Sequence, residues 1–269
     1  MEICGDRGSG KTALLIECAV RCLLPRSIDG RAFEGHGMSA ILVDTEGTFP
    51  VARLAHTLFG RLVNAGLGEE QASFEARQCM DRLHLMRCAS RREFLLGLAG
   101  LCRPTPSPGD ERRRGTHESA TALFIDSVSA YQWIERAEQR PSLARLAEAR
   151  GGGAALAGDS TSFNAQLASL VRWLRTERRM LVVWTRVPGT LHASGFEFPI
   201  VQETPLWSSL TTHRLRLRKE RSARVDGPGY QMMLEVDPAA AKLAGGTAIP
   251  RFDVWLHAGG GVELRQPIR

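Results

Sequence analysis

Apolar residues are arranged along the chain in two ways, as short continuous runs and as stretches in which they recur every three or four positions. The runs predict buried strands of a parallel sheet, because such strands are covered on both faces. They are residues 2–4, 40–44, 83–87, 122–126 and 180–184. The periodic stretches predict helices. These are residues 13–24, 50–64, 91–101 and 163–178. Alternating strands and helices predict an α/β fold, with a mostly parallel twisted sheet flanked by helices.

The pattern changes after residue 210. Residues 210–218 alternate, with Leu215 and Leu217 on one face and three arginines, Arg214, Arg216 and Arg218, on the other. Residues 231–236, 252–257 and 262–264 also have the composition of strands. Successive strands without intervening helices predict an antiparallel C-terminal extension of the parallel sheet.

We expect residues 1–269 to form one domain. Two segments of low apolar content, 103–118 with its prolines and arginines and 137–160 with its glycines, are predicted to be mobile insertions. The first strand begins only three residues before a glycine-rich loop, whereas strands average about 5–6 residues. We therefore expect this strand to be truncated, so that Met1 is not established as the true start.

The composition excludes fewer classes of function than the sequence motifs do. The formal net charge is +6, but only three of the 35 basic residues are lysines, an arginine excess that a GC-rich coding sequence also produces. No apolar run is long enough to span a bilayer, and we expect no secretory signal. The six cysteines lack the spacing of a zinc site and are expected to be reduced thiols.

The string at residues 5–12 has the form Gly-x-x-x-x-Gly-Lys-Thr and lies between a predicted strand and a predicted helix. In that context the loop and the helix N-terminus direct backbone N–H groups toward phosphates. Lys11 is expected to reach the outer phosphates and Thr12 to bind Mg²⁺. The predicted nucleotide-binding residues of this loop are Gly5, Asp6, Arg7, Gly8, Ser9, Gly10, Lys11 and Thr12.

Asp126 ends the apolar run that starts at Ala122. A carboxylate at the carboxyl end of a buried strand, beside such a loop, can hold the water shell of Mg²⁺. We therefore predict that Asp126 joins the nucleotide site and contacts the metal through water, together with Thr12. The predicted cofactors are ATP and Mg²⁺.

Four blocks of sequence together resemble the RecA-like recombinase ATPases, in the eukaryotic DNA-repair branch. They are residues 5–12, 43–49, 123–127 and 215–219. Two further stretches, 21–27 and 126–136, resemble the recombinase paralogues within that branch. The resemblance implies a RecA-like P-loop NTPase core.

The resemblance also suggests roles for two more residues. Glu46 falls where the family places the glutamate that polarises the attacking water, which makes it the predicted catalytic residue; the alternative is a helix cap. Arg186 stands where recombinases carry a glutamine that senses the γ-phosphate. We predict a nucleotide contact for Arg186, with exposure to solvent as the alternative.

Three functions follow from these observations. The first is an ATP-binding recombinase paralogue in a nuclear, heteromeric complex for homologous-recombination repair of double-strand breaks. Its predicted protein partners are the main recombinase and other recombinase paralogues, among which we expect the D-type paralogue. It is also predicted to bind single-stranded or branched DNA through loops 129–160 and 187–208. Such a chain would have at most weak DNA-dependent ATPase activity.

The second function is a filament-forming strand-exchange recombinase. Arg186, and the expected lack of a Phe-x-x-Ala self-polymerisation hook, disfavour it. The third is a P-loop small-molecule kinase, with segment 103–118 as an arginine-bearing lid. The block at residues 44–49 and the late strands disfavour this third function.

Overall fold

The computed structural model describes nine stretches of the chain: residues 1–102, 120–131, 163–187, 190–193, 196–199, 209–220, 231–236, 252–256 and 262–265. The predicted insertions 103–118 and 137–160 lie outside these residues, as does most of the two predicted DNA-binding loops. Among the described helices, none combines the length and the apolar character needed to cross a bilayer.

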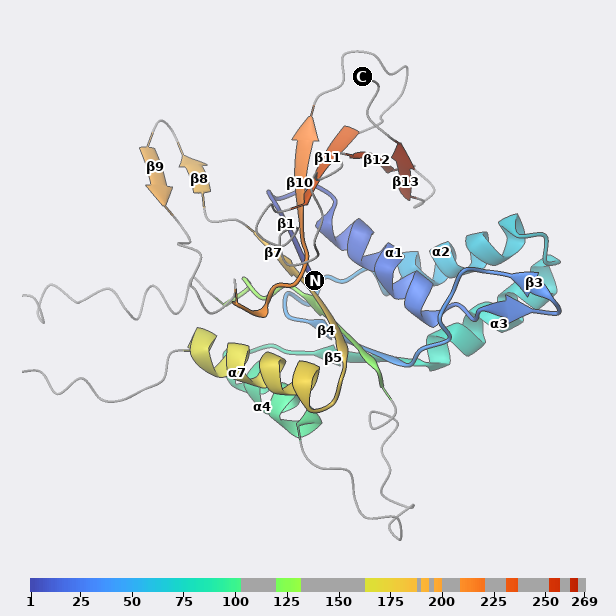
Figure 1. The fold of residues 1–269 in the computed structure, drawn as a ribbon, viewed down its shortest axis with the longest axis horizontal. Coiled ribbons are helices and arrows are strands. Elements are labelled where there is room, and N and C mark those ends of the chain that lie inside the picture. The colour runs from blue at the N-terminus through green and yellow to red at the C-terminus, as the bar shows by residue number, and fades with distance from the viewer. Residues whose placement is uncertain are drawn as a thin grey trace, which may run out of the picture.

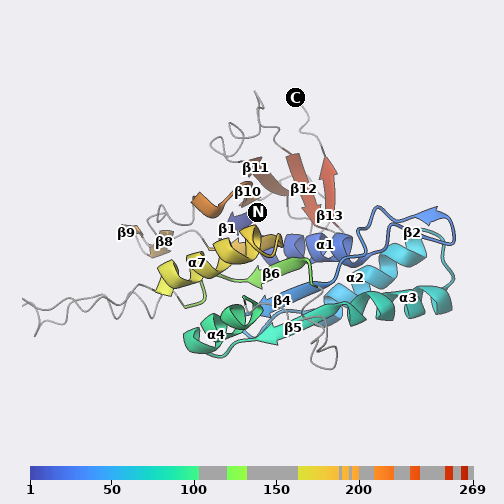
Figure 2. The same cartoon turned by 60° about the horizontal axis from the view of Figure 1, so that its bottom comes forward.

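A nine-stranded sheet forms the centre of the described part (Figures 1 and 2), in the order β13-β12-β11-β10-β1-β7-β6-β4-β5. The six strands from β10 to β5 are parallel, and β11 to β13 continue the sheet antiparallel. This arrangement confirms the predicted fold class. The strands are β1 (Glu2–Gly5), β4 (Ala40–Asp44), β5 (Leu83–Arg87), β6 (Ala122–Asp126), β7 (Leu181–Arg186), β10 (Arg214–Glu220), β11 (Gln231–Val236), β12 (Phe252–Leu256) and β13 (Val262–Arg265).

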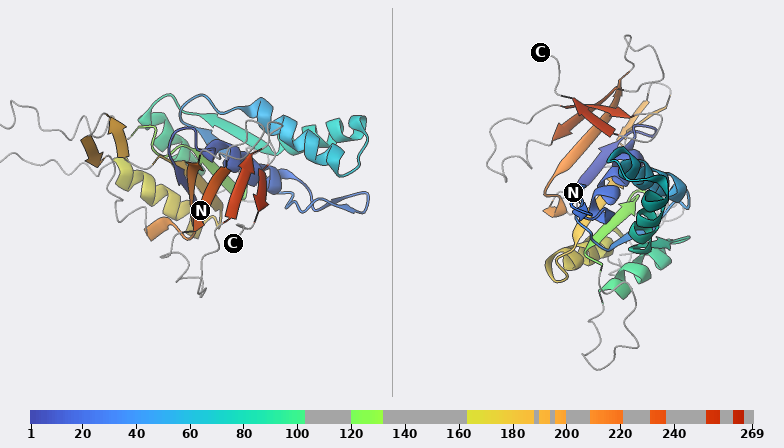
Figure 3. Two further views of the ribbon diagram at one scale, coloured as in Figure 1. Left: turned by 90° about the horizontal axis from the view of Figure 1, so that it is seen from above. Right: turned by 90° about the vertical axis from the view of Figure 1, so that its right-hand side faces the viewer.

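Helices cover both faces of the parallel strands, and α1–α3 and α7 lie on opposite sides in the right-hand panel of Figure 3. On one side are α1 (Lys11–Leu23), α2 (Val51–Asn64) and α3 (Glu69–Asp81). On the other are α4 (Arg91–Leu101) and α7 (Phe163–Thr176). Two small ladders complete the described elements. They pair β2 (Ser27–Ile28) with β3 (Arg31–Ala32), and β8 (Thr190–Ala193) with β9 (Phe196–Pro199).

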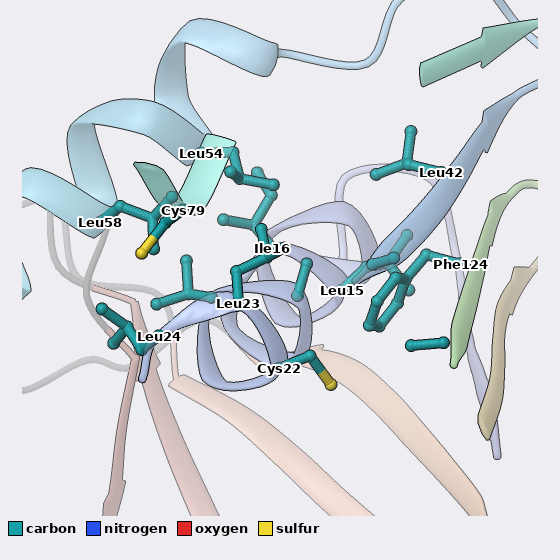
Figure 4. Packing of buried hydrophobic residues seen from close by; sticks show 14 of the residues in the cluster. Leu15, Ile16, Cys22, Leu23, Leu24, Leu42, Leu54, Leu58, Cys79 and Phe124 are labelled. Atoms are coloured by element: carbon teal, nitrogen blue, oxygen red, sulfur yellow. The ribbon is translucent and has the colours of Figure 1, made fainter. Parts of the chain in front are cut away.

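Helix α1 is the centre of the larger core cluster (Figure 4). Leu15 faces Phe124 of β6, and Ile16 and Leu23 lie toward α2 and α3. Burial of a leucine-sized side chain contributes about 1.5–3 kcal/mol, so this helix is anchored independently of any ligand. The loop that precedes α1 is therefore attached to a fixed element.

Most predicted elements are present, and the limits of several differ by one or more residues from the prediction. Helix α7 ends at Thr176, two residues early, and β7 runs to Arg186. Strand β10 begins at Arg214 because Leu210 turns inward instead: its side chain is buried, and its carbonyl accepts a 2.7 Å hydrogen bond from Arg175 Nη1.

Candidate nucleotide site

The glycine-rich loop lies at the carboxyl end of β1 and leads into α1. A side chain at Gly5 would meet the Leu217 carbonyl oxygen at 2.4 Å, so only glycine allows β10 to pass this close. Gly10 caps the helix with φ of 90°, which favours glycine. These two glycines give the loop the shape in which backbone N–H groups can face a phosphate.

Lys11 is buried, and its ammonium donates hydrogen bonds to the carbonyls of Gly5 (2.8 Å) and Asp6 (2.6 Å). Burial lowers the pKa of Lys11, while the charges of Asp126, Asp6 and Glu46 act to raise it. A partly desolvated cation next to loop amides favours binding of an anion, because the anion restores the charge compensation that burial removed.

Asp126 joins three elements at the carboxyl end of the sheet. Its Oδ2 accepts a 2.8 Å hydrogen bond from Thr12 Oγ1, at the start of α1. Its Oδ1 accepts from Thr185 Oγ1, on strand β7, which lies between β1 and β6. Thr185 is fully buried and was not predicted from the sequence. The structure thus places the hydroxyl and the carboxylate of the predicted Mg²⁺ site in direct contact.

Glu46 follows the neighbouring strand β4 in a turn shaped by Asp44. The buried Asp44 carboxylate accepts hydrogen bonds from the N–H groups of Gly47 (2.8 Å) and Phe49 (3.1 Å). Glu46 itself is exposed, and its Oε1 accepts a 3.3 Å hydrogen bond from Ser127 Oγ, next to Asp126. The charge of Glu46 acts on the pKa of Lys11, so both residues belong to one electrostatic site. Asp44 makes the hydrogen bonds of this turn, and helix α2 begins after Pro50 without a side-chain cap, so Glu46 does not act as a helix cap in this structure.

Arg186 ends β7 but its guanidinium contacts Glu2 of β1. Glu2 Oε2 also accepts a 2.6 Å hydrogen bond from Arg214 Nε of β10. All three side chains are buried, with exposed fractions of 0% for Glu2 and 4% for each arginine. The structure therefore rules out the alternative of a solvent-exposed Arg186. A nucleotide contact of Arg186 remains a prediction.

The residues present fit a magnesium–nucleotide complex. Besides the contacts of Lys11 and Asp126, Ser9 Oγ is buried in the loop and has no hydrogen-bond partner among the described residues. A buried hydroxyl without a partner is costly, and a phosphate oxygen would supply one. By contrast, the described residues contain no group of three or more His, Cys, Asp or Glu that could hold a metal ion on its own. All six cysteines are free.

The mostly parallel sheet and the glycine-rich loop between β1 and α1 form the arrangement of a P-loop nucleotide-binding core, consistent with a RecA-like fold. No family model matches the chain. It is 33% identical over 144 residues to the DNA repair protein XRCC2 of Mus musculus, an alignment that covers 53% of this chain and 44% of the mouse protein. It is 27% identical over 160 residues to the DNA repair protein XRCC2 homolog of Arabidopsis thaliana, an alignment that covers 51% of this chain and 42% of the Arabidopsis protein.

A third relative is the DNA repair and recombination protein RadA of Methanoculleus marisnigri, 35% identical over 89 residues, which cover 33% of this chain and 24% of RadA. The matched part of the chain thus spans less than half the length of each relative. The similarities confirm the resemblance to RecA-like DNA-repair proteins and, within them, to XRCC2.

Proposed function

We propose that this chain is an ATP-binding recombinase paralogue that acts in a heteromeric complex in homologous-recombination repair of DNA double-strand breaks. The observation that carries the proposal is the direct contact of Thr12 with Asp126 beside the buried Lys11, in a chain similar to XRCC2. The nucleus is the compartment that this function requires.

The loop residues hold the phosphates in this proposal. Backbone N–H groups of residues 8–12 and the Lys11 ammonium bind phosphate oxygens, and the Ser9 hydroxyl adds a further contact. Thr12 and Asp126 would hold Mg²⁺, Thr12 through its hydroxyl and Asp126 through a bound water. Mg²⁺ at this position would offset the negative charge that develops on the phosphates.

Glu46 is the proposed general base. Its exposed carboxylate can accept a proton from water, while Ser127 restrains its orientation. RecA-like sites are commonly completed by a neighbouring subunit, so we propose that the isolated chain hydrolyses ATP weakly and that DNA and partners raise the rate.

The proposed partners are other recombinase paralogues, in particular the D-type paralogue, together with the main recombinase and single-stranded or branched DNA. One observation favours this function over filament formation. Contrary to our expectation, a Phe-x-x-Ala string does occur, at residues 49–52. Phe49, however, is 5% exposed and belongs to the core around α1, so this string cannot insert into a neighbouring molecule.

Two measurements test the proposal. In equilibrium titration with Mg-ATP, Lys11→Ala should bind at least about tenfold more weakly than the wild type, because a charge-assisted contact is lost. Arg77→Ala, which removes an exposed cation on α3, is the matched control and should bind normally.

Affinity purification of the chain from its own cells should recover recombinase paralogues. ATP-dependent filaments of the chain alone on single-stranded DNA, or phosphorylation of a small acceptor, would instead favour the other two functions.

A further inference from the structure

A continuous row of hydrogen bonds runs from Glu46 to the residue that follows β7. Ser127 Oγ donates to Glu46 Oε1 over 3.3 Å, and the hydroxyls of Ser127 and Ser129 are 3.0 Å apart. The backbone N–H of Val187 donates to Ser129 Oγ over 3.2 Å.

The direction of these hydrogen bonds is fixed by their two ends. A carboxylate accepts and a backbone N–H donates, so each serine must accept from one neighbour and donate to the next. Ser129 therefore donates to Ser127, and Ser127 donates to Glu46. In a chain of this kind each hydrogen bond polarises the next, so a change at one end affects the other.

The surroundings hold the two serines in place. Both are buried, Ser127 with 3% and Ser129 with 9% of their surface exposed. Thr45 Oγ1 accepts from the Ser127 N–H and donates to its carbonyl, each over 2.8 Å. The hydroxyl of Tyr131 donates a 3.2 Å hydrogen bond to the carbonyl of Thr45. These contacts restrict rearrangement to the hydroxyl groups and to the two ends of the row.

The two ends lie in functionally different places. Glu46 shares an electrostatic environment with Lys11 of the phosphate loop. Val187 is the first residue after β7, where the chain leaves the sheet toward β8. The side chain of Arg186, at the sensor position of the family, is occupied by its contact with Glu2. The row of hydrogen bonds through Ser127 and Ser129 connects the nucleotide site to Val187 without involving the side chain of Arg186.

We propose that Ser127 and Ser129 are positioning residues that couple the Glu46 carboxylate to the backbone of Val187, so that nucleotide binding alters the hydrogen bond of Val187. This inference rests on the proposed nucleotide function of Lys11 and Glu46. Phosphates bound at the loop bring negative charge near Glu46, which changes how strongly Glu46 accepts from Ser127. The change passes through the two hydroxyls to Val187.

Hydrogen exchange of the Val187 amide, resolved to single residues by mass spectrometry, measures this coupling. In the full-length wild type, a saturating non-hydrolysable ATP analogue with Mg²⁺ should change the exchange rate about fivefold or more, the lower range of typical coupling between sites. In Ser127→Ala the rate without nucleotide should stay near the wild-type value, because Ser129 still accepts from Val187. Its response to nucleotide should be lost.

Two further variants separate coupling from structure. Glu46→Gln, at an exposed position that tolerates the change, should reduce the response because a neutral amide is a weaker acceptor. Ser73→Ala, at a half-buried position of α3 outside the site, should respond like the wild type. A wild-type response in Ser127→Ala would overturn the coupling, as would an unresponsive Val187 in wild-type protein that titration shows to be saturated. Failure of the wild type to bind nucleotide in that titration would overturn the proposed function and the coupling together.

Discussion

Thr12 and Asp126 are 114 positions apart in sequence, yet Thr12 Oγ1 donates a 2.8 Å hydrogen bond to Asp126 Oδ2. Thr12 lies at the start of α1, which follows β1, and Asp126 ends β6. Strands β1 and β6 are not neighbours, because β7 lies between them. Thr185 belongs to β7, and its hydroxyl donates a hydrogen bond to Asp126 Oδ1, the other carboxylate oxygen. Both oxygens of the carboxylate thus accept hydrogen bonds from neutral hydroxyl groups rather than from charged side chains.

We predict that Asp126→Asn removes most of the Mg²⁺ dependence of nucleotide binding. The amide fits the same space and can still bond one of the two threonines, so the fold should persist, but its charge is gone. Loss of a group that orients metal ligands typically costs about 10-fold to 100-fold in metal affinity. Titration of ATP with and without Mg²⁺ measures the effect, and chelation of Mg²⁺ from the wild type should produce a similar loss.

An equal Mg²⁺ dependence in Asp126→Asn and in the wild type would show that Asp126 does not serve the metal. The matched control is Asp81→Asn at the end of α3, an exposed acid outside the site. It should leave both affinities unchanged.

We also predict a role for Thr185 that sequence patterns did not indicate. Thr185→Val keeps the shape of the side chain but removes its hydrogen bond to the Asp126 carboxylate, a charged acceptor, which should cost about 1.5–3 kcal/mol of stability and weaken Mg-ATP binding. Thr57→Val is the control, because the buried Thr57 hydroxyl donates a hydrogen bond to the backbone carbonyl of Arg53 in α2, away from the site, and loss of this neutral hydrogen bond should cost about 0.5–1.5 kcal/mol. Urea denaturation should show a loss of stability in both variants, and only Thr185→Val should bind Mg-ATP more weakly. Equal nucleotide affinities would limit Thr185 to a structural role.

Sequence patterns predicted the site wherever one short segment carries the information. The loop at residues 5–12 and the acid after the run 122–125 both have a local signature, and the bounds of α4 match the prediction fully. Helix α3 was not predicted because few of its residues are apolar, and only Ala72, Ala76 and Cys79 are buried.

Contacts between distant segments could not be predicted in the same way. Thr185 and Ser127 acquire roles only because β7 and the end of β4 lie beside β6, which depends on strand order. Arg214 was placed by its alternation on the face opposite Leu217, and there it is buried against Glu2 instead of facing solvent. Alternation gives the face of a strand, but what covers that face depends on the tertiary structure.

The cysteines predict a loss of stability in alkali. Burial raises the pKa of Cys4, Cys22 and Cys88 to about 11 and that of Cys18 to about 12, from an ordinary value of 9.0. Because the folded state keeps these thiols protonated, their contribution to stability is complete below pH 9 and is lost as the pH rises through 11–12. The unfolding free energy should fall by at least about 1.4 kcal/mol between pH 9 and 11.

Urea denaturation at a series of pH values measures this slope. A variant with Cys18→Ala and Cys22→Ala, both within α1, removes two of the four groups and should have a shallower slope. If the double substitution leaves the slope of the unfolding free energy against pH unchanged, titratable groups other than these thiols cause the loss of stability in alkali.

The contact of Arg186 with Glu2 gives the last prediction, which separates a structural from a nucleotide role. Glu2→Gln removes the carboxylate that both buried arginines contact, which should cost about 3–5 kcal/mol. Arg186→Gln, which introduces the glutamine of the resembling recombinases, leaves Glu2 with Arg214 and should cost less, about 1.5–3 kcal/mol for one charged hydrogen bond. If Arg186 serves the fold alone, Mg-ATP affinity of folded Arg186→Gln will equal that of the wild type. A loss of tenfold or more, about 1.4 kcal/mol, in protein that remains folded would establish the nucleotide contact predicted for Arg186.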